Sequence, residues 1–551
     1  MPTDSGDEAS SRERGKYAES SRIPRRQKGV APPIVRSWIL PMVAVIIVAV
    51  LFCTAFYVLD SIIFGSGPPS VLGIVGHYLA FDPELITDAL PALGMTIVAV
   101  LGIVLTVVAI IVQLSSERYT GVAIMFLREP THIAVISFYI VASLCAVWLS
   151  VTLRPDFVPT SLLLLVMVLT SLGLAVMLPY FAYTFWFLEP SNIINRLRLH
   201  TTGLAERGLA SSSEEEVARL QGRVLQQMGE ITDIANNSIE GRDKIIAASA
   251  IDALCDFGVH YISNKPDSIH SWYSFGEEVR FNPDFVAMDS ELLAELETRG
   301  LWVEWKTMHE LLRVYQEALG SMSDINSQVA IDTRYLGEAA AATRQTDLIR
   351  MVFRFFNCYL QVAIDQRIEQ TADAVLLQYR MLLEELLRRD LSVEACEGVR
   401  FMKFYGYLAF EEELPAITEI SAYDIASLCR YAHAQNLGCD RAMLSQLLSL
   451  DAEEAVQTHR HYRGLSGVRK AQIRLGIYYL SVGEDASAQL IADDMADMAE
   501  ESRVEMHNEL LDQSPPHVWE ILDRGRNLHY LAESERVYSD RFLAMAAKRA
   551  D

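Results

Sequence analysis

The chain has 551 residues, a formal net charge of −24 and a positive mean hydropathy, although 21% of its residues are charged. This length allows two or three folding units, and the composition requires that apolar and charged residues lie in different segments. From Pro190 to the C-terminus, 36 Lys and Arg residues stand against 58 Asp and Glu residues, a net charge of −22. Because so acidic a region repels phosphate backbones, the composition argues against nucleic acid as a partner.

Residues 1–36 form a polar tail, rich in Ser and Arg, that cannot bury an apolar core, and we expect it to be a disordered basic tail in the cytoplasm. Its basic residues either contact anionic lipid head groups or simply direct the topology. We expect no secretory signal peptide, because the uncharged run after Arg36 continues to Leu59, which is too long for the apolar core of such a peptide.

Four apolar stretches each have about the 20 residues that a helix needs to cross a bilayer. Together they predict a transmembrane domain over residues 37–189. The loop over residues 60–88 carries Asp and Glu but no Lys or Arg, and is interpreted as an exposed acidic loop in preference to an acidic ring at a pore mouth. Its apolar piece Val71–Phe81 is too short to span a bilayer and is interpreted as interfacial or re-entrant. The Lys and Arg bias predicts that both termini lie in the cytoplasm. The predicted spans are residues 38–59, 93–114, 132–153 and 161–185.

The second span and the charged turn after it hold the candidate functional residues. Gly102 and Thr106 form a small-xxx-small pair, which lets two helices approach closely. Gln113 adds a polar side chain at the end of the span, and the span is alternatively interpreted as the lining of a pore. Arg118 and Arg128 lie in the turn, and their charge suits docking onto acidic residues of the C-terminal region.

The spans themselves carry few polar groups. No Asp, Glu, Lys or Arg lies in the middle of a span, which argues against an ion-coupled carrier. His132 lies at the edge of the third span and is interpreted as an interfacial polar group rather than a proton relay. Pro179 predicts a kink or a weakened helix in the fourth span.

Residues 190–551 show helical periodicity and no run of alternating strands. The clearest case is Met351–Arg389, where apolar residues recur mainly every three or four positions and predict one continuous face on a long helix. A tetratricopeptide-like spacing that includes Gly476 is not renewed one repeat earlier, where Ala442 takes the glycine position. The predicted fold class is therefore all-α, with four transmembrane helices followed by a large acidic cytosolic α-helical domain. That domain is expected to be an irregular bundle or a solenoid, without a repeat array.

No segment carries a pattern of catalysis or of cofactor binding. The sequence lacks a phosphate-binding loop, a dinucleotide-binding glycine motif and a zinc-protease motif. His459 and His461 are the most ligand-like pair, but their spacing suits a strand and their surroundings are helical. The seven cysteines are scattered without a C-x-x-C pair, which is typical of reduced thiols. We therefore expect no enzyme activity, no cofactor and no metal site.

The second span ends in Ile110-Ile-Val-Gln-Leu-Ser-Ser-Glu-Arg-Tyr119, and Phe126-Leu-Arg128 precedes the third span. This hairpin resembles the bacterial family of predicted membrane proteins called domain of unknown function 2254, and a weaker similarity lies between Ile231 and Leu254. The chain departs from the family at Thr120-Gly121, where the family tends to have Ser-Pro-Arg. The resemblance, over roughly residues 90–260, implies four spans and a cytosolic helical part, and it brings no activity.

The sequence therefore predicts a membrane-anchored sensing, regulatory or scaffolding protein. The lipid bilayer surrounds the spans, residues 190–551 bind a cytosolic protein partner, and the membrane part supports a homo-oligomer. The alternative is an oligomeric channel-like protein whose second span lines a pore.

Overall fold

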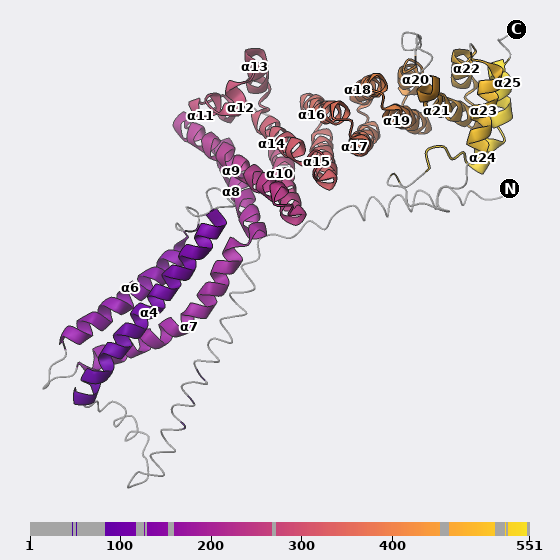
Figure 1. Ribbon diagram of the computed structural model, residues 1–551. Coiled ribbons are helices and arrows are strands. Elements are labelled where there is room, and N and C mark those ends of the chain that lie inside the picture. The colour runs from indigo at the N-terminus through magenta and orange to yellow at the C-terminus, as the bar shows by residue number, and fades with distance from the viewer. Residues whose placement is uncertain are drawn as a thin grey trace. The chain divides into compact units, whose positions relative to one another are not determined.

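The computed structural model is entirely helical within the residues that it describes, without a strand (Figure 1). The chain divides into two compact units, which comprise residues 1–115 with 122–189, and residues 116–121 with 190–551. Each unit is described by itself. The described residues are 83–116, 129–152, 159–266, 271–451, 462–496, 498–512 and 527–547, together with Ile47, Leu51, Ala55, Phe126 and Arg524.

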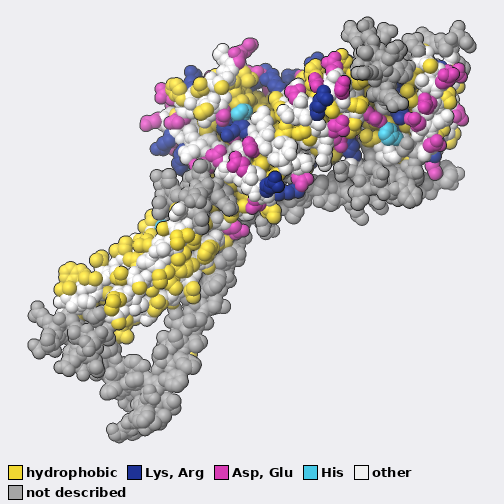
Figure 2. Space-filling view, viewed as in Figure 1, with side chains coloured by type: hydrophobic (Ala, Val, Ile, Leu, Met, Phe, Trp, Pro, Cys, Tyr) yellow, Lys and Arg dark blue, Asp and Glu magenta, His cyan; other side chains and the backbone are white. Residues whose placement is uncertain are grey.

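The described part of the first unit contains three long apolar helices, α4 (Pro83–Ser116), α6 (Pro130–Thr152) and α7 (Thr160–Leu188). They lie side by side around a small apolar core that includes Ile97 and Ala146 (Figure 1). Hydrophobic side chains dominate the face that Figure 2 shows, with almost no charged group among them. Helices suit a bilayer because they satisfy their backbone polar groups internally.

Three of the four predicted spans coincide with these helices. The predictions for residues 93–114, 132–153 and 161–185 fall on α4, α6 and α7, whereas the span over residues 38–59 lies almost entirely outside the described residues. The predicted weak point at Pro179 does not interrupt α7, which is assigned as one continuous helix.

Helix α4 is longer than predicted. It begins at Pro83, inside the loop predicted over residues 60–88, and has 34 residues. At 1.5 Å per residue it is about 51 Å long, whereas the hydrocarbon layer of a bilayer is about 30 Å thick. Part of α4 therefore extends beyond the apolar layer if the helix crosses a membrane.

A fourth helix, α10 (Lys244–Asn264), is also long and apolar enough to cross a membrane by length and composition alone. Its most apolar window is 56% buried, however, against 22% in α4, α6 and α7. Helices α8 (Pro190–Ala210), α9 (Glu214–Glu240), α14 (Trp302–Ala318) and α15 (Ser323–Ala342) pack around it. The apolar side chains of α10 therefore serve a protein core.

Five helices of the second unit follow a strict period that was not expected from the sequence. All five have the same length, 20 residues, and they begin at one constant interval, at positions 323, 346, 369, 392 and 415. The search at tetratricopeptide spacing failed because that repeat places two helices within about 34 residues, whereas two helix periods here take 46 residues, from position 323 to position 369. The expectation that no repeat array is present was therefore wrong for this part of the chain. After α15, the helices are α16 (Thr346–Asp365), α17 (Glu369–Arg388), α18 (Ser392–Glu411) and α19 (Pro415–Ala434).

The turns that follow these five helices share one conformation. Each contains a residue with a positive φ of 54 to 61° that is not glycine. The next N–H then bonds back to a carbonyl of the last helical turn, as from Leu391 to Leu386 (2.9 Å) and from Leu414 to Ala409 (2.8 Å). This is the Schellman closure. The positive-φ residues are Arg344, Arg367, Asp390, Glu413 and Asn436.

Alternate helices pack in two layers. The inner layer, as we name it, runs through α10, α15, α17, α19 and α21, and the outer layer through α9, α14, α16, α18, α20 and α22 (Figure 1). Of the two expected architectures, the second unit therefore has the solenoid. The remaining elements are η1 (Ser271–Tyr273), α11 (Glu277–Arg280), α12 (Pro283–Val286), α13 (Ser290–Arg299), α20 (Asp440–Leu448), α21 (Tyr462–Ser481), α22 (Asp485–Asp494), α23 (Glu500–Leu511), α24 (Glu533–Arg536) and α25 (Ser539–Ala547).

Glycine at one of these turns should stabilise the solenoid. A side chain with a Cβ pays about 1 kcal/mol in the left-handed conformation, and glycine does not. We expect Glu413→Gly to raise the free energy of unfolding by about 1 kcal/mol, measured in urea on the full chain in detergent. The matched control, Glu413→Ala, keeps a Cβ and should give no such gain. Equal stability of the two variants would contradict the argument.

Candidate functional site

The sequence candidates on the second span lie along one face of α4. Gly102, Thr106 and Gln113 are exposed within the described structure, and their spacing of four and seven residues places them on one side of the helix. A Cβ added at Gly102 would meet no described atom within 4 Å, and the Thr106 hydroxyl donates to the Gly102 carbonyl (2.8 Å). Arg118 and Arg128 lie outside the described residues.

Helices α6 and α7 are joined by polar side chains that the sequence did not connect. His132 is buried against α7, and its Nδ1 shares a hydrogen bond with the Tyr180 hydroxyl. The Tyr183 hydroxyl donates to Glu129 Oε1 (2.9 Å). Such bonds between apolar helices contribute about 0.6 kcal/mol each. These contacts therefore hold the helices together, and their contribution is structural.

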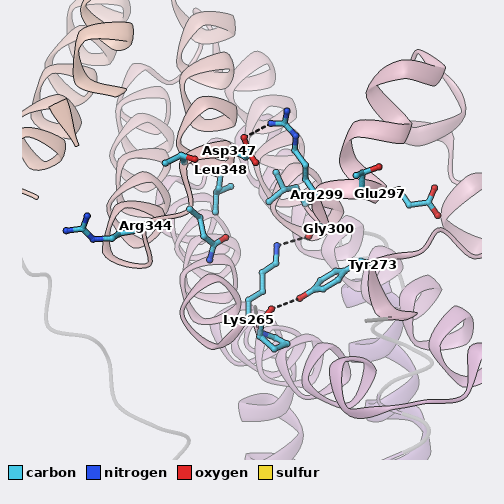
Figure 3. Close-up of a pocket in the computed structure, with 13 residues that line it drawn as sticks. Lys265, Tyr273, Glu297, Arg299, Gly300, Arg344, Asp347 and Leu348 are labelled. Atoms are coloured by element: carbon cyan, nitrogen blue, oxygen red, sulfur yellow. Dashed lines mark hydrogen bonds and ion pairs between the residues drawn. The ribbon is translucent and has the colours of Figure 1, made fainter. Parts of the chain in front are cut away.

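A cleft of about 330 Å³ lies in the second unit, where the end of α10 meets the start of α14 and the turn before α16 (Figure 3). Lys265 Nζ donates to the Gly300 carbonyl (2.7 Å) and to Glu304 Oε1 (2.7 Å). Arg299 pairs with Asp347 (2.6 Å) across the rim. These charged side chains are paired with one another, so they offer a ligand few available hydrogen-bonding groups.

The inner layer carries a repeated polar contact. Arg334 Nε donates to Gln378 Oε1 (2.8 Å) between α15 and α17, and Arg380 Nε lies 3.2 Å from Asp424 Oδ1 between α17 and α19. The two arginines are two helix periods apart, and so are their acceptors. We name the surface of α10, α15, α17, α19 and α21 that carries these contacts the inner face. The repeat therefore places arginines and acceptors at equivalent positions along it.

A C-terminal segment lies on this inner face. Arg524 donates to Asp373 on α17 (2.6 Å) and to Asp424 on α19 (2.6 Å), and only 9% of its side chain is exposed. Further along, the His529 ring hydrogen-bonds the Tyr423 hydroxyl of α19 (3.0 Å). The sequence could not signal the pairing of Arg524 with Asp424, because 100 residues separate them.

The same segment continues to α21 and back to α19. Arg474 of α21 donates to the Leu528 carbonyl (2.6 Å), and Arg430 of α19 donates to Glu535 (2.8 Å). Leu531 is fully buried between these contacts. Its described part before α24 is non-helical, so a non-helical stretch of chain binds across three inner helices through charged and apolar groups.

At the other end of the inner face, between α10 and α15, carboxylates meet. Gln328 donates to Asp252 (2.9 Å) and to Asp332 (3.1 Å) through one nitrogen. Asp332 is 2% exposed, and its Oδ2 has no hydrogen-bond partner among the described residues. Burial raises the pKa of Asp332 well above its usual range, and the charges of Asp252 and Asp256 raise it further. Arg198 lies 4.0 Å from Asp256.

Three cysteines that are far apart in the sequence lie near one another at α18, α19 and the start of α20. Burial raises the pKa of Cys396 to about 11, and the neighbouring thiol of Cys439 adds to the effect. Cys429 is fully buried beside them. Among the described residues, no group of three or more His, Cys, Asp and Glu is arranged to hold a metal ion.

Comparison of the chain with protein-family models, with curated proteins and with solved structures gave no match.

The buried pair of Lys265 and Glu304 should dominate the stability of the cleft, because their side chains are 9% and 1% exposed. Removing one partner of a buried pair leaves an uncompensated charge and costs about 3–5 kcal/mol. We expect Lys265→Met to lower the free energy of unfolding by that amount. The control is Lys244→Met, which breaks an exposed pair with Asp324 and should cost less than about 1 kcal/mol. Similar losses in both variants would contradict this assignment.

The raised pKa of Asp332 predicts a pH dependence of folding. A carboxyl whose pKa is higher in the folded state binds more protons there, so stability falls as pH rises from the unfolded pKa of about 4 through the folded pKa. Asp332→Asn removes this titration. We expect the variant to gain stability relative to the natural chain as pH rises from about 4 to about 8, measured by urea unfolding. A stability difference that does not change with pH would contradict the prediction.

Proposed function

We propose that the chain is a multi-pass protein of a bacterial inner membrane and acts as an anchored sensing, regulatory or scaffolding protein. Its apolar helices would hold it in the bilayer, and both termini would face the cytoplasm according to the Lys and Arg bias. The likeness of the hairpin to domain of unknown function 2254 is consistent with this architecture and adds no activity. The second unit would then present its inner face to cytosolic protein partners.

One observation carries the proposal: the inner face already holds a non-helical segment. The contacts of Arg524, Leu528 and His529 with α17, α19 and α21 combine ion pairs with hydrogen bonds. Leu531 adds a fully buried apolar anchor. Solenoids commonly bind partners along such continuous surfaces. A surface that binds one segment of its own chain has the chemistry to bind a segment of another protein.

The alternative, a pore lined by the second span, is supported by fewer observations than the partner-binding function. Its support is the shared face of Gly102, Thr106 and Gln113 on α4. The Thr106 hydroxyl is already bonded within its own helix (2.8 Å). Close packing against another apolar helix uses the same small residues.

Site-specific photocrosslinking in cells tests the proposal. A benzophenone amino acid replaces Tyr335, a partly exposed residue of α15, and should give one discrete covalent adduct with a cellular protein. The same adduct should form when the purified chain and that purified protein are mixed and irradiated. The same amino acid at Phe404, an exposed aromatic residue of α18 in the outer layer, is the matched control. Adducts of equal pattern at both positions, or none at Tyr335, would contradict a partner-binding inner face.

A further inference from the structure

Two steps of the inner face can be compared position by position. Asp332 of α15 and Asp424 of α19 are four helix periods apart, and each is the tenth residue of its helix. Both are almost completely buried, with 2% and 0% exposure. The repeat therefore buries an aspartate at the same place in two steps of the solenoid.

The two aspartates have opposite surroundings. Asp424 faces two arginines, Arg380 from the preceding inner helix at 3.2 Å and Arg524 from the C-terminal segment at 2.6 Å. Asp332 instead faces Asp252 and is linked to it through the amide of Gln328. A buried carboxylate is stable when it is paired and costly when it is not.

The nearby cations do not fill this role. Arg334, two residues after Asp332, points its guanidinium to Gln378 and Glu338. Arg198 donates to Asn195 (2.8 Å) and lies 4.0 Å from Asp256. Within the described residues, the buried Oδ2 of Asp332 is left without a hydrogen-bond partner, and the nearby carboxylates of Asp252 and Asp256, which are exposed, raise the pKa of Asp332.

We propose that Asp252, Asp256 and Asp332 form a binding site for an arginine side chain of a partner protein, as Asp373 and Asp424 do for Arg524. This inference rests on the proposed function. A guanidinium suits the site because its planar fork of donors pairs with carboxylate oxygens. It would supply the partner that Oδ2 of Asp332 lacks. Because arginine favours the ionised form of Asp332, binding should strengthen as pH rises.

The probe is a fluorescent peptide of residues 520–531, the segment of this chain that carries Arg524. It would be titrated, by fluorescence anisotropy, onto the full chain in nanodiscs of uncharged lipid. We expect Asp332→Asn with Asp252→Asn to weaken binding by at least about tenfold, because removing partners of a buried charge has effects of this size. Replacing the peptide arginines by citrulline should weaken it similarly. The control, Glu500→Gln with Glu501→Gln, removes two exposed charges of α23 and should change little.

Several outcomes would overturn the inference. Unchanged binding in the Asp252/Asp332 variant, tight binding of the citrulline peptide, or no binding at all would each do so. Loss of binding only in Asp373→Asn would show that the peptide replaces the chain's own segment on α17 and α19. The inference would then fail while the partner-binding function stood, and crosslinking at Tyr335 decides that function separately.

The basic N-terminal tail is a competing occupant. Neutralising Arg22, Arg25, Arg26 and Lys28 to Gln in the full chain should leave peptide affinity unchanged if the site serves a partner. An increase of about tenfold or more would mean that the tail already fills it, and the assignment to a partner would be wrong. The circular dichroism of every variant should match that of the natural chain. Asp332→Asn removes a buried charge, so a folding defect is not expected.

Discussion

The second unit depends on the geometry of one turn. Each helix of the regular region ends with a residue in the left-handed conformation, and the Schellman hydrogen bond then closes the helix and reverses the chain. All of these helices have the same length, and all of the turns between them have the same length. Successive helices therefore alternate between two layers in constant register. This register places Arg334 and Arg380, and also Asp332 and Asp424, at equivalent positions on the inner face.

That register explains how charge is distributed on the inner face. An acidic chain with a net charge of −24 must place many carboxylates, and most can lie in solvent. The inner helices, however, bury aspartates at the seam between neighbours, where pairing decides the energetic cost. At Asp424 the chain supplies two arginines, one of them from its own C-terminal segment. At Asp332 it supplies carboxylates instead. Equivalent positions of the repeat therefore hold a paired aspartate, Asp424, and an aspartate among carboxylates, Asp332, and this difference is the basis of the proposed binding site.

Much of this architecture could be predicted from the sequence. Helical periodicity and three of the apolar spans correspond to observed helices, because burying an apolar face and crossing a bilayer both leave strong local patterns. The prediction of one long helix over Met351–Arg389 was wrong, because the turn at Arg367 divides this stretch into α16 and α17. The constant interval between the solenoid helices was missed because their turns carry Arg, Asp, Glu and Asn in place of the usual glycine. Helix α10 shows that composition alone can also mislead, because its composition fits a membrane span whereas its packing is that of a protein core.

The candidate residues were harder to predict. Gly102, Thr106 and Gln113 do share one face of α4. The contacts that organise the inner face, however, join residues such as Arg524 and Asp373 across 151 positions. No periodicity within a helix reports on such pairs. The equivalence of Arg334 and Arg380 was the one available signal, and it becomes visible only when the chain is aligned at two helix periods.

The central claim is that the inner face holds a segment through arginine and buried aspartate. Hydrogen–deuterium exchange of the full chain, compared between the natural protein and Arg524→Gln, tests it most directly. The account predicts that the amides of residues 527–535 exchange faster in Arg524→Gln than in the natural protein. Exchange in α9 and α14 should not change, because the segment contacts α17, α19 and α21 instead. Unchanged protection of residues 527–535 in the variant would contradict it.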